Sequence, residues 1–287
     1  MNPERLRFVC GAALMLTWAS ISGAQNVLLQ IKPHAGDTIA VKLHQKVELT
    51  ATRADCVNQS PAPRRPANEQ ERKGPCAASP RQMTTVTEIF SRAIVQGSSR
   101  EGAMVLAVTD SIRAAVSRGG KPGPPKRLSG REGSMKLRVS RDGGAEVIDS
   151  DASEELRAIF GQMPATLSRQ SVSVGEKWKR EMRIPIAGEA GALGLVRATF
   201  QLDSLGKNGD IAYISMRGAL SHDHRDGSNS ELDGWITASM QLDRRLAWIT
   251  ESRAEIDVTS IFRPAGGAEP MRVRTRVTQL LKAGTTR

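Results

Sequence analysis

The sequence predicts a mainly β protein whose strands form one long, curved antiparallel sheet, a half-open barrel of the meander type. Three observations predict this class. Apolar residues recur at every second position along most of the chain, short turn signals separate these runs, and several runs exceed ten residues. One short amphipathic helix is expected to pack on the concave face of the sheet.

Alternation between apolar and polar residues is clearest in the last quarter of the chain. The runs 232–242 and 246–262 place an apolar residue at nearly every second position. This period is typical of strands with one face on an apolar core and the other in water. Turns such as 141–144 and 206–210 leave too little chain for helical crossovers, so neighbouring strands are expected to be antiparallel. Strands this long favour a strongly curved sheet or an open barrel.

Asp110 interrupts one of these runs. Between Met104 and Val116 a series of apolar residues that includes Leu106 and Val108 occupies even positions, and Asp110 falls on the same parity. A charged side chain on an apolar face is costly unless it is paired or the strand is locally irregular. We therefore expect Asp110 to be buried with a partner, to lie at a bulge, or to sit at the mouth of a cavity.

The expected helix follows Asp151. Asp151 can cap it, and Glu154 three residues later completes a pattern like a capping box. An apolar stripe at helical spacing follows before Pro164 ends the helix, formed by Leu156, Ile159, Phe160 and Met163. Simple closure of the core is the ordinary interpretation of this stripe. A lid over a cavity is the functional alternative.

Residues 1–24 have the pattern of a secretory signal peptide. Arg5 and Arg7 precede an apolar run over 8–21, and small residues at 22–24 predict cleavage before Gln25. The run of 14 residues is shorter than the roughly 20 that a membrane-spanning helix needs. We therefore expect an exported protein, periplasmic or extracellular, that is soluble after cleavage and has no transmembrane segment.

Residues 25–287 are expected to form a single β-rich domain with flexible loops at about 57–80 and 119–132, which are rich in proline, glycine and charge. Removing 1–24 lowers the net charge from +11 to +10. Export and an aromatic content of 3% argue against a nucleic-acid partner, because stacking platforms need several aromatic rings. The basic balance could instead attract an anionic envelope surface, or could serve solubility alone.

Cysteine and histidine offer few sites for chemistry. Cys56 and Cys76 remain after cleavage and are expected to form one disulfide, since their spacing matches neither a redox pair nor a zinc pattern. His222 and His224, with Asp226 nearby, are weak metal candidates on an expected hairpin tip. The sequence contains no nucleophile elbow of the G-x-S-x-G type, and we expect no enzyme activity and no cofactor.

Several turn and core motifs resemble a family of exported bacterial proteins of unknown function. They are Gly36-Asp37, Met163-Pro164, Val174-Gly175-Glu176-Lys177-Trp178, 209–214 and Leu232-Asp233-Gly234, spread over Val27 to Lys282. Such proteins are similar to the lipoprotein-carrier (LolA-like) superfamily. The resemblance implies a half-barrel with a helical plug around an apolar cavity that holds acyl chains of lipids or lipoproteins. It implies no catalytic residues.

The first functional hypothesis is therefore a non-catalytic binding protein that shelters a lipid or acyl chain between sheet and helix. The residues expected to face its cavity are Leu106, Val108, Phe160, Trp178, Phe200, Ile214, Ile236 and Met240. For Trp178 the alternative is a core tryptophan that follows the turn glycine Gly175 and begins a strand. The rival hypothesis for the whole chain is an envelope interaction module that docks on anionic surfaces through a basic face and has no ligand cavity.

Overall fold

The structure is a computed structural model that describes residues 26–53, 81–127, 133–151, 164–185, 193–222, 231–262 and 269–286. These residues form one 13-stranded sheet in which every pairing is antiparallel. Eleven strands follow the order β7-β6-β3-β2-β1-β13-β12-β11-β10-β9-β8, and the short strands β4 and β5 each pair with β3. The strands are β1 (Thr38–Arg53), β2 (Arg81–Ser98), β3 (Gly102–Arg118), β4 (Lys121–Pro122), β5 (Lys126–Arg127), β6 (Ser134–Ser140), β7 (Ala145–Ser150), β8 (Lys177–Pro185), β9 (Leu193–Gly206), β10 (Ile211–His222), β11 (Glu231–Asp243), β12 (Trp248–Phe262) and β13 (Met271–Thr285).

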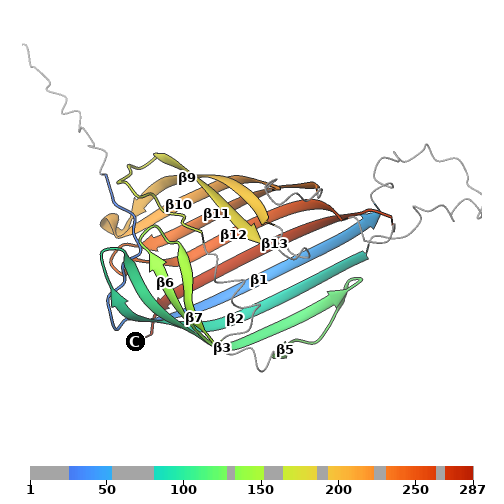
Figure 1. Cartoon of the computed structure of the whole chain (residues 1–287), viewed down its shortest axis with the longest axis horizontal. Coiled ribbons are helices and arrows are strands. Elements are labelled where there is room, and N and C mark those ends of the chain that lie inside the picture. Colours follow the sequence, from blue (N-terminus) through green and yellow to red (C-terminus); the bar gives the residue numbers. More distant parts are fainter. Residues whose placement is uncertain are drawn as a thin grey trace, which may run out of the picture.

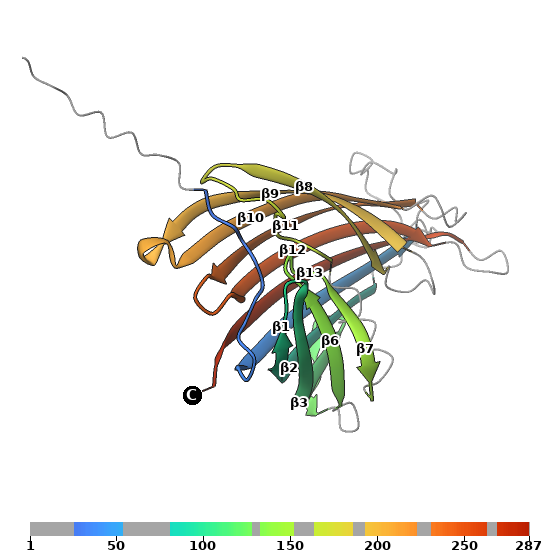
Figure 2. The ribbon, with the colours of Figure 1, turned by 60° about the vertical axis from the view of Figure 1, so that its left-hand side comes forward.

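The sheet arches over itself without closing, which confirms the predicted half-open barrel (Figures 1 and 2). Its longest strands are β2 with 18 residues and β3 with 17 residues. The first and last strands meet in the middle of the sheet, where Leu43 of β1 lies opposite Leu281 of β13 and Ile89 of β2. The edge strands β7 and β8 are the two ends of the hydrogen-bonded order. The sheet therefore has two limbs, with β7 and β8 as their outer edges.

Alternation sorts the side chains onto two faces of this sheet. On β1, Ile39 and Leu43 are buried, whereas Lys42 and His44 between and beside them are partly exposed. We call the side of Ile39 the inner face, because the buried residues of the facing strands form one cluster with it. The opposite side is the outer face. Burial of the inner face is the hydrophobic driving force that the period-two pattern encodes.

A bulge in β3 reverses this alternation. Phe90 pairs with Ser111 and Ser91 pairs with Thr109, so Asp110 has no cross-strand partner. Before the bulge odd residues such as Val105 are inner, and after it Ile112 is inner. Asp110 is thus at a bulge, as one of the three expectations had it, and it is exposed and bonded to Arg92 with an Nη2–Oδ1 distance of 2.7 Å.

Of the helix and the two flexible loops predicted between strands, the structure describes only part of the loop 119–132. The predicted helix over 152–163 lies outside the described residues, as does the loop 57–80. The Asp151 carboxylate accepts a hydrogen bond from the Ser134 amide at 2.5 Å. The described part of the expected loop 119–132 contributes β4 and β5, which pair with β3. Within the described chain the one helical element is a short 3₁₀ turn, η3 (Lys207–Gly209).

Residues 26–33 form an extended segment, the N-terminal strap, that crosses one end of the sheet (Figure 2). Val27 exchanges two 2.9 Å backbone hydrogen bonds with Val172, the Ile31 amide donates to the Arg141 carbonyl at 2.8 Å, and the Lys32 amide donates to the Ala247 carbonyl at 3.0 Å. Because its side chains alternate, Leu29 and Ile31 are buried. The strap therefore connects turns that belong to both limbs.

Candidate functional site

A cavity of about 290 Å³ lies between the two limbs on the inner face. One wall comes from β1, β2, β3, β6 and β7, and the other from β11, β12 and β13. Its apolar lining is Ile31, Val41, Ala93, Val105, Ala107, Leu137, Val139, Ala145, Pro164, Met240, Trp248, Ile249 and Leu281. Hydroxyls of Ser91, Thr166 and Ser252 and the amide of Gln279 are the uncharged polar groups beside them. Arg92 also lines the cavity, and its guanidinium group is paired with Asp110. Such a lining suits an uncharged, apolar part of a ligand.

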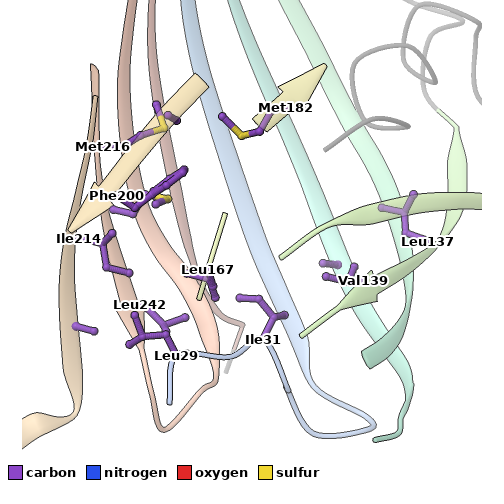
Figure 3. Packing of buried hydrophobic residues seen from close by; sticks show 14 of the residues in the cluster. Leu29, Ile31, Leu137, Val139, Leu167, Met182, Phe200, Ile214, Met216 and Leu242 are labelled. Atoms are coloured by element: carbon purple, nitrogen blue, oxygen red, sulfur yellow. The ribbon is translucent and has the colours of Figure 1, made fainter. Parts of the chain in front are cut away.

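The strap closes one end of this cavity. Figure 3 shows Leu29, Ile31 and Leu167 lying between the limb that carries Leu242 and the limb that carries Val139. All five belong to one cluster of buried apolar residues. The strap residues thus fill the space at that end, and Ile31 alone among them also contacts the cavity. The packed core ends where the cavity begins.

Asp142, in the turn between β6 and β7, holds the closed end together. Its carboxylate accepts hydrogen bonds from Ser140 Oγ at 2.6 Å and from Arg169 Nε at 2.9 Å, and it lies 3.5 Å from Arg180 Nη2 on β8. Its backbone carbonyl accepts the amides of Thr166 and Leu167, each at 2.9 Å. These bonds tie the β6–β7 edge to β8 across the opening of the sheet.

The charge of Asp142 is stabilised where it lies. Burial by itself would raise the pKa of the carboxyl group, but the hydrogen bonds from Ser140 and Arg169 and the positive charges of Arg169 and Arg180 outweigh it. The net result is a pKa below the ordinary value of 3.8. The carboxylate is therefore ionised at neutral pH and bonded on several sides.

Trp178 is half-buried and packs against the core beside this connection. Its indole Nε1 donates to the Thr166 carbonyl at 2.9 Å, and its ring stacks on Phe200 with centroids 5.7 Å apart and planes 10° apart. Gly175, with φ of 86°, makes the turn before β8. The interpretation as a core tryptophan that begins a strand is the one that the contacts support.

The structure distributes the predicted cavity residues over several places. Met240 lines the cavity. Phe200 and Ile214 are fully buried in the core cluster, and Ile236 is half-buried and packs against that cluster. Phe160 lies outside the described residues.

Leu106 and Val108 differ most from the expectation, because they lie on the outer face of β3, whereas Val105 and Ala107 of the same strand lie on its inner face. The bulge at Asp110 is the reason. Even-numbered residues face inward at Ile112, but the extra residue in the bulge means that odd-numbered residues face inward before it.

Most residues that line the cavity were not expected to do so. Ile31 lies before the first strand, and its only sequence signal is the apolar alternation of Val27, Leu29 and Ile31. Trp248 and Ile249 come just before the bulge at Thr250, and both lie beside the cavity. Their shared position depends on contacts between limbs that are distant in sequence.

Of the weak metal candidates and the cysteines, only His222 lies in the described part of the chain. His222 is buried at the end of β10 and has interactions with other groups. His224, Asp226, Cys56 and Cys76 lie outside the described residues. Among the residues that the structure does describe, no three histidine, cysteine or acidic side chains gather as metal ligands would. The described part of the chain also contains no helix with the length and hydropathy of a membrane span.

Comparison with known proteins shows no matching family model and no matching curated protein. A solved structure of lipovitellin titled for its lipid–protein interactions matches with a TM-score of 0.47 and 10% identity over 88% of this chain. The match spans 26% of the lipovitellin chain, about a quarter of its length. OccK5 from Pseudomonas aeruginosa has a TM-score of 0.29 and 7% identity, covering 88% of this chain and 99% of its own. The outer membrane protein AlkL, in lipid bilayers, has a TM-score of 0.19 and 12% identity, covering 100% and 98%.

Proposed function

We propose that this chain is an exported, non-catalytic binding protein that shelters a hydrocarbon chain, such as the acyl chain of a lipid or lipoprotein, on the inner face of its half-barrel. The observation that carries the proposal is the apolar cavity of about 290 Å³ between the limbs. Each methylene group buried there contributes about 0.8 kcal/mol. A short stretch of hydrocarbon therefore suffices for binding.

The inner face continues as an apolar surface beyond the cavity. Val47 and Leu49 of β1 lie beside Val277 of β13, which pairs with Ile256 of β12, and all are only half-buried. The volume of the cavity is near the lower end of the range for ligand sites, roughly 300–1,000 Å³. A longer chain would extend from the cavity over this surface, which we call the trough. Covering the trough would remove further apolar area from water.

The rival function, docking on an anionic surface through a basic outer face, has weaker support. Many cationic side chains on the outer face form ion pairs with carboxylates of the same face. Arg274 contacts Asp257 at 2.7 Å, and Arg92 contacts Asp110 at the same distance. Cations neutralised in this way attract a distant anionic surface weakly. The apolar cavity has no role in that function.

A cavity-filling substitution tests the proposal. We expect the purified protein to carry lipid that native mass spectrometry detects and organic extraction releases, and we expect Ala107→Trp to lose it because the new ring occupies the cavity. Ala115→Trp is the matched control, since Ala115 lies on the outer register of the same strand, opposite Val86. A protein without lipid that also fails to bind added palmitate would contradict the proposal. So would an Ala107→Trp protein that keeps its fold and its lipid.

A further inference from the structure

The charged residues of the central strands are strongly segregated between the two faces. On the described residues of β1, β2, β3, β11, β12 and β13, carboxylates occur on the outer register or in the bulge: Glu48, Glu88, Asp110, Glu231, Asp233, Asp243, Glu251, Glu255 and Asp257. The inner register of the same strands carries no carboxylate. Its only charged residues in the described strands are Arg53, Arg81 and Arg118.

These three arginines lie together at the end of the trough that is farthest from the strap. Arg81 pairs with Ala51, so it is diagonal to Arg53, and Arg118 pairs with Met83, so it is diagonal to Arg81. Diagonal neighbours in an antiparallel sheet are about 7–8 Å apart, within joint reach of long side chains. Lys121 of β4 pairs directly with Arg118 and adds a fourth cation on the same register. We call these four residues the cationic rim.

The cationic rim is short of anionic partners within the described part of the chain. Arg53 forms an ion pair with Glu269. Arg81, Arg118 and Lys121 are exposed and have no ion pair with any described residue. Like charges placed directly opposite one another, as in Arg118 and Lys121, repel and are destabilising. An anion bound between these groups would relieve that repulsion.

We propose that the ligand is an amphiphile with an anionic head group, a phosphate or a carboxylate, that is held by the cationic rim while its hydrocarbon tail runs along the trough into the cavity. This inference rests on the proposed function and adds the chemical class and the orientation of the ligand. Guanidinium groups suit it, because they donate paired hydrogen bonds to phosphate and carboxylate oxygens.

The spacing along β1 is compatible with this orientation. Arg118 is level with Leu49, and the cavity wall begins at Val41. The eight residue steps from one position to the other correspond to about 26 Å at the rise of an antiparallel strand. On β1 the inner residues over this distance include Leu43 and Val47, with Gln45 as the polar interruption, and the neighbouring strands add the hydroxyls of Thr85, Thr87 and Thr275. A tail that leaves the cationic rim therefore meets apolar side chains and uncharged polar groups along its path.

Two lysolipids that share a palmitoyl tail test the inference. Palmitoyl lysophosphatidylglycerol is anionic and palmitoyl lysophosphatidylcholine is zwitterionic, so titration calorimetry below their micelle-forming concentrations isolates the effect of head-group charge. We expect tighter binding of the anionic lipid. Arg81→Gln and Arg118→Gln should each weaken it about fivefold, the scale of one cation–anion contact near water, and should weaken the zwitterionic lipid less, because its choline group offsets the charge of the same phosphate.

Arg113→Gln is the matched control, because it removes the same charge from the outer register of β3. It should leave both affinities unchanged, and added salt should reduce the preference for the anionic lipid. A palmitate arm extends the test to a carboxylate head group. Equal binding of the two lysolipids, unaffected by the rim substitutions, would overturn this inference and leave the proposed function standing. Binding of none of the three amphiphiles would overturn both.

Discussion

At the scale of single residues, Asp142 is the side chain on which the closed end of the half-barrel depends most. It is 7% exposed and receives hydrogen bonds from Ser140 and from Arg169, while Arg180 approaches it from the opposite edge of the sheet. A buried carboxylate with several donors contributes much more than an exposed ion pair, because its partners are left unsatisfied when it is removed.

Asp142→Asn should therefore lower the free energy of unfolding by about 2 kcal/mol, the scale of hydrogen bonds to a charged group. Urea denaturation of the two proteins measures this difference. Asp110→Asn removes an arginine-paired carboxylate at an exposed bulge, where the loss should stay below about 1 kcal/mol. Equal losses for the two variants would mean that Asp142 does not join the limbs.

The stability of the fold should also depend on pH through Asp142 and Asp257. The pKa of Asp257 is lowered, mainly by the hydrogen bond from Arg274 and despite its burial, so both carboxyl groups have folded-state pKa values below 3.8. At pH values below the pKa that these carboxyl groups have in the unfolded chain, the unfolded chain binds more protons than the folded protein. The free energy of unfolding therefore rises with pH in this range.

We expect the free energy of unfolding to receive the full contribution of these two groups above about pH 4 and to lose it progressively as the pH falls through their folded-state pKa values. Urea titrations at a series of pH values check this. Asp142→Asn should show a shallower fall on acidification than the unsubstituted protein. An unchanged slope would assign the acid sensitivity to other groups.

At the scale of elements, the strap and the β3 bulge decide which residues reach the interior. The strap has few backbone hydrogen bonds, so its position depends on the alternate side chains that it buries. Leu29 is 1% exposed, whereas its neighbour Leu28 is 43% exposed. The bulge acts in the same way on β3, because one extra residue moves all side chains beyond it to the other face.

Leu29→Ala should lower the free energy of unfolding by about 3 kcal/mol, since it removes buried methyl groups and leaves a cavity behind. Leu28→Ala makes the same chemical change one position away on the exposed side and should cost below about 0.5 kcal/mol. Thermal unfolding and urea denaturation of the pair give the difference directly. Similar small effects would show that the strap does not contribute to the folded core.

At the scale of the whole molecule, a sheet that arches without closing leaves space between its limbs. The N-terminal strap and the Asp142 bonds close one end of that space, and the trough leads away from it toward the cationic rim. Because a ligand between the limbs would contact both of them, its binding should stabilise the fold as a unit.

Adding lysophosphatidylglycerol at about a hundredfold excess over its Kd should raise the free energy of unfolding by about 2.7 kcal/mol, as mass action requires for a ligand that binds only the folded state. Differential scanning calorimetry measures the accompanying rise in Tm. Ala107→Trp, with its cavity filled, should show little of this rise, and Ala115→Trp should show all of it. Stabilisation of both variants alike would mean that the lipid binds elsewhere.

Much of the architecture could be predicted from the sequence because its cause is local. A period of two in hydrophobicity specifies strands, and short polar turns specify antiparallel neighbours, as the pairing of β10, β11 and β12 shows. The same pattern placed Met240, Phe200 and Ile214 on the inner face, but Phe200 and Ile214 lie in the packed core and not at the cavity that they were expected to line. It did not identify Val105 or Ala107, because the extra residue in the bulge is visible only when β3 is paired with β2.

The sequence by itself determined the β class, the long strands and the assignment of most residues to an apolar or a polar face, since each depends on residues a few positions apart. The tertiary structure alone decided which faces meet. Ile31, Val105 and Leu281 surround one cavity although they are far apart in the chain, and Arg53, Arg81 and Arg118 gather through strand register. The reason is physical: periodicity is a property of one segment, whereas a cavity and a cluster of charge exist only between segments that long-range contacts bring together.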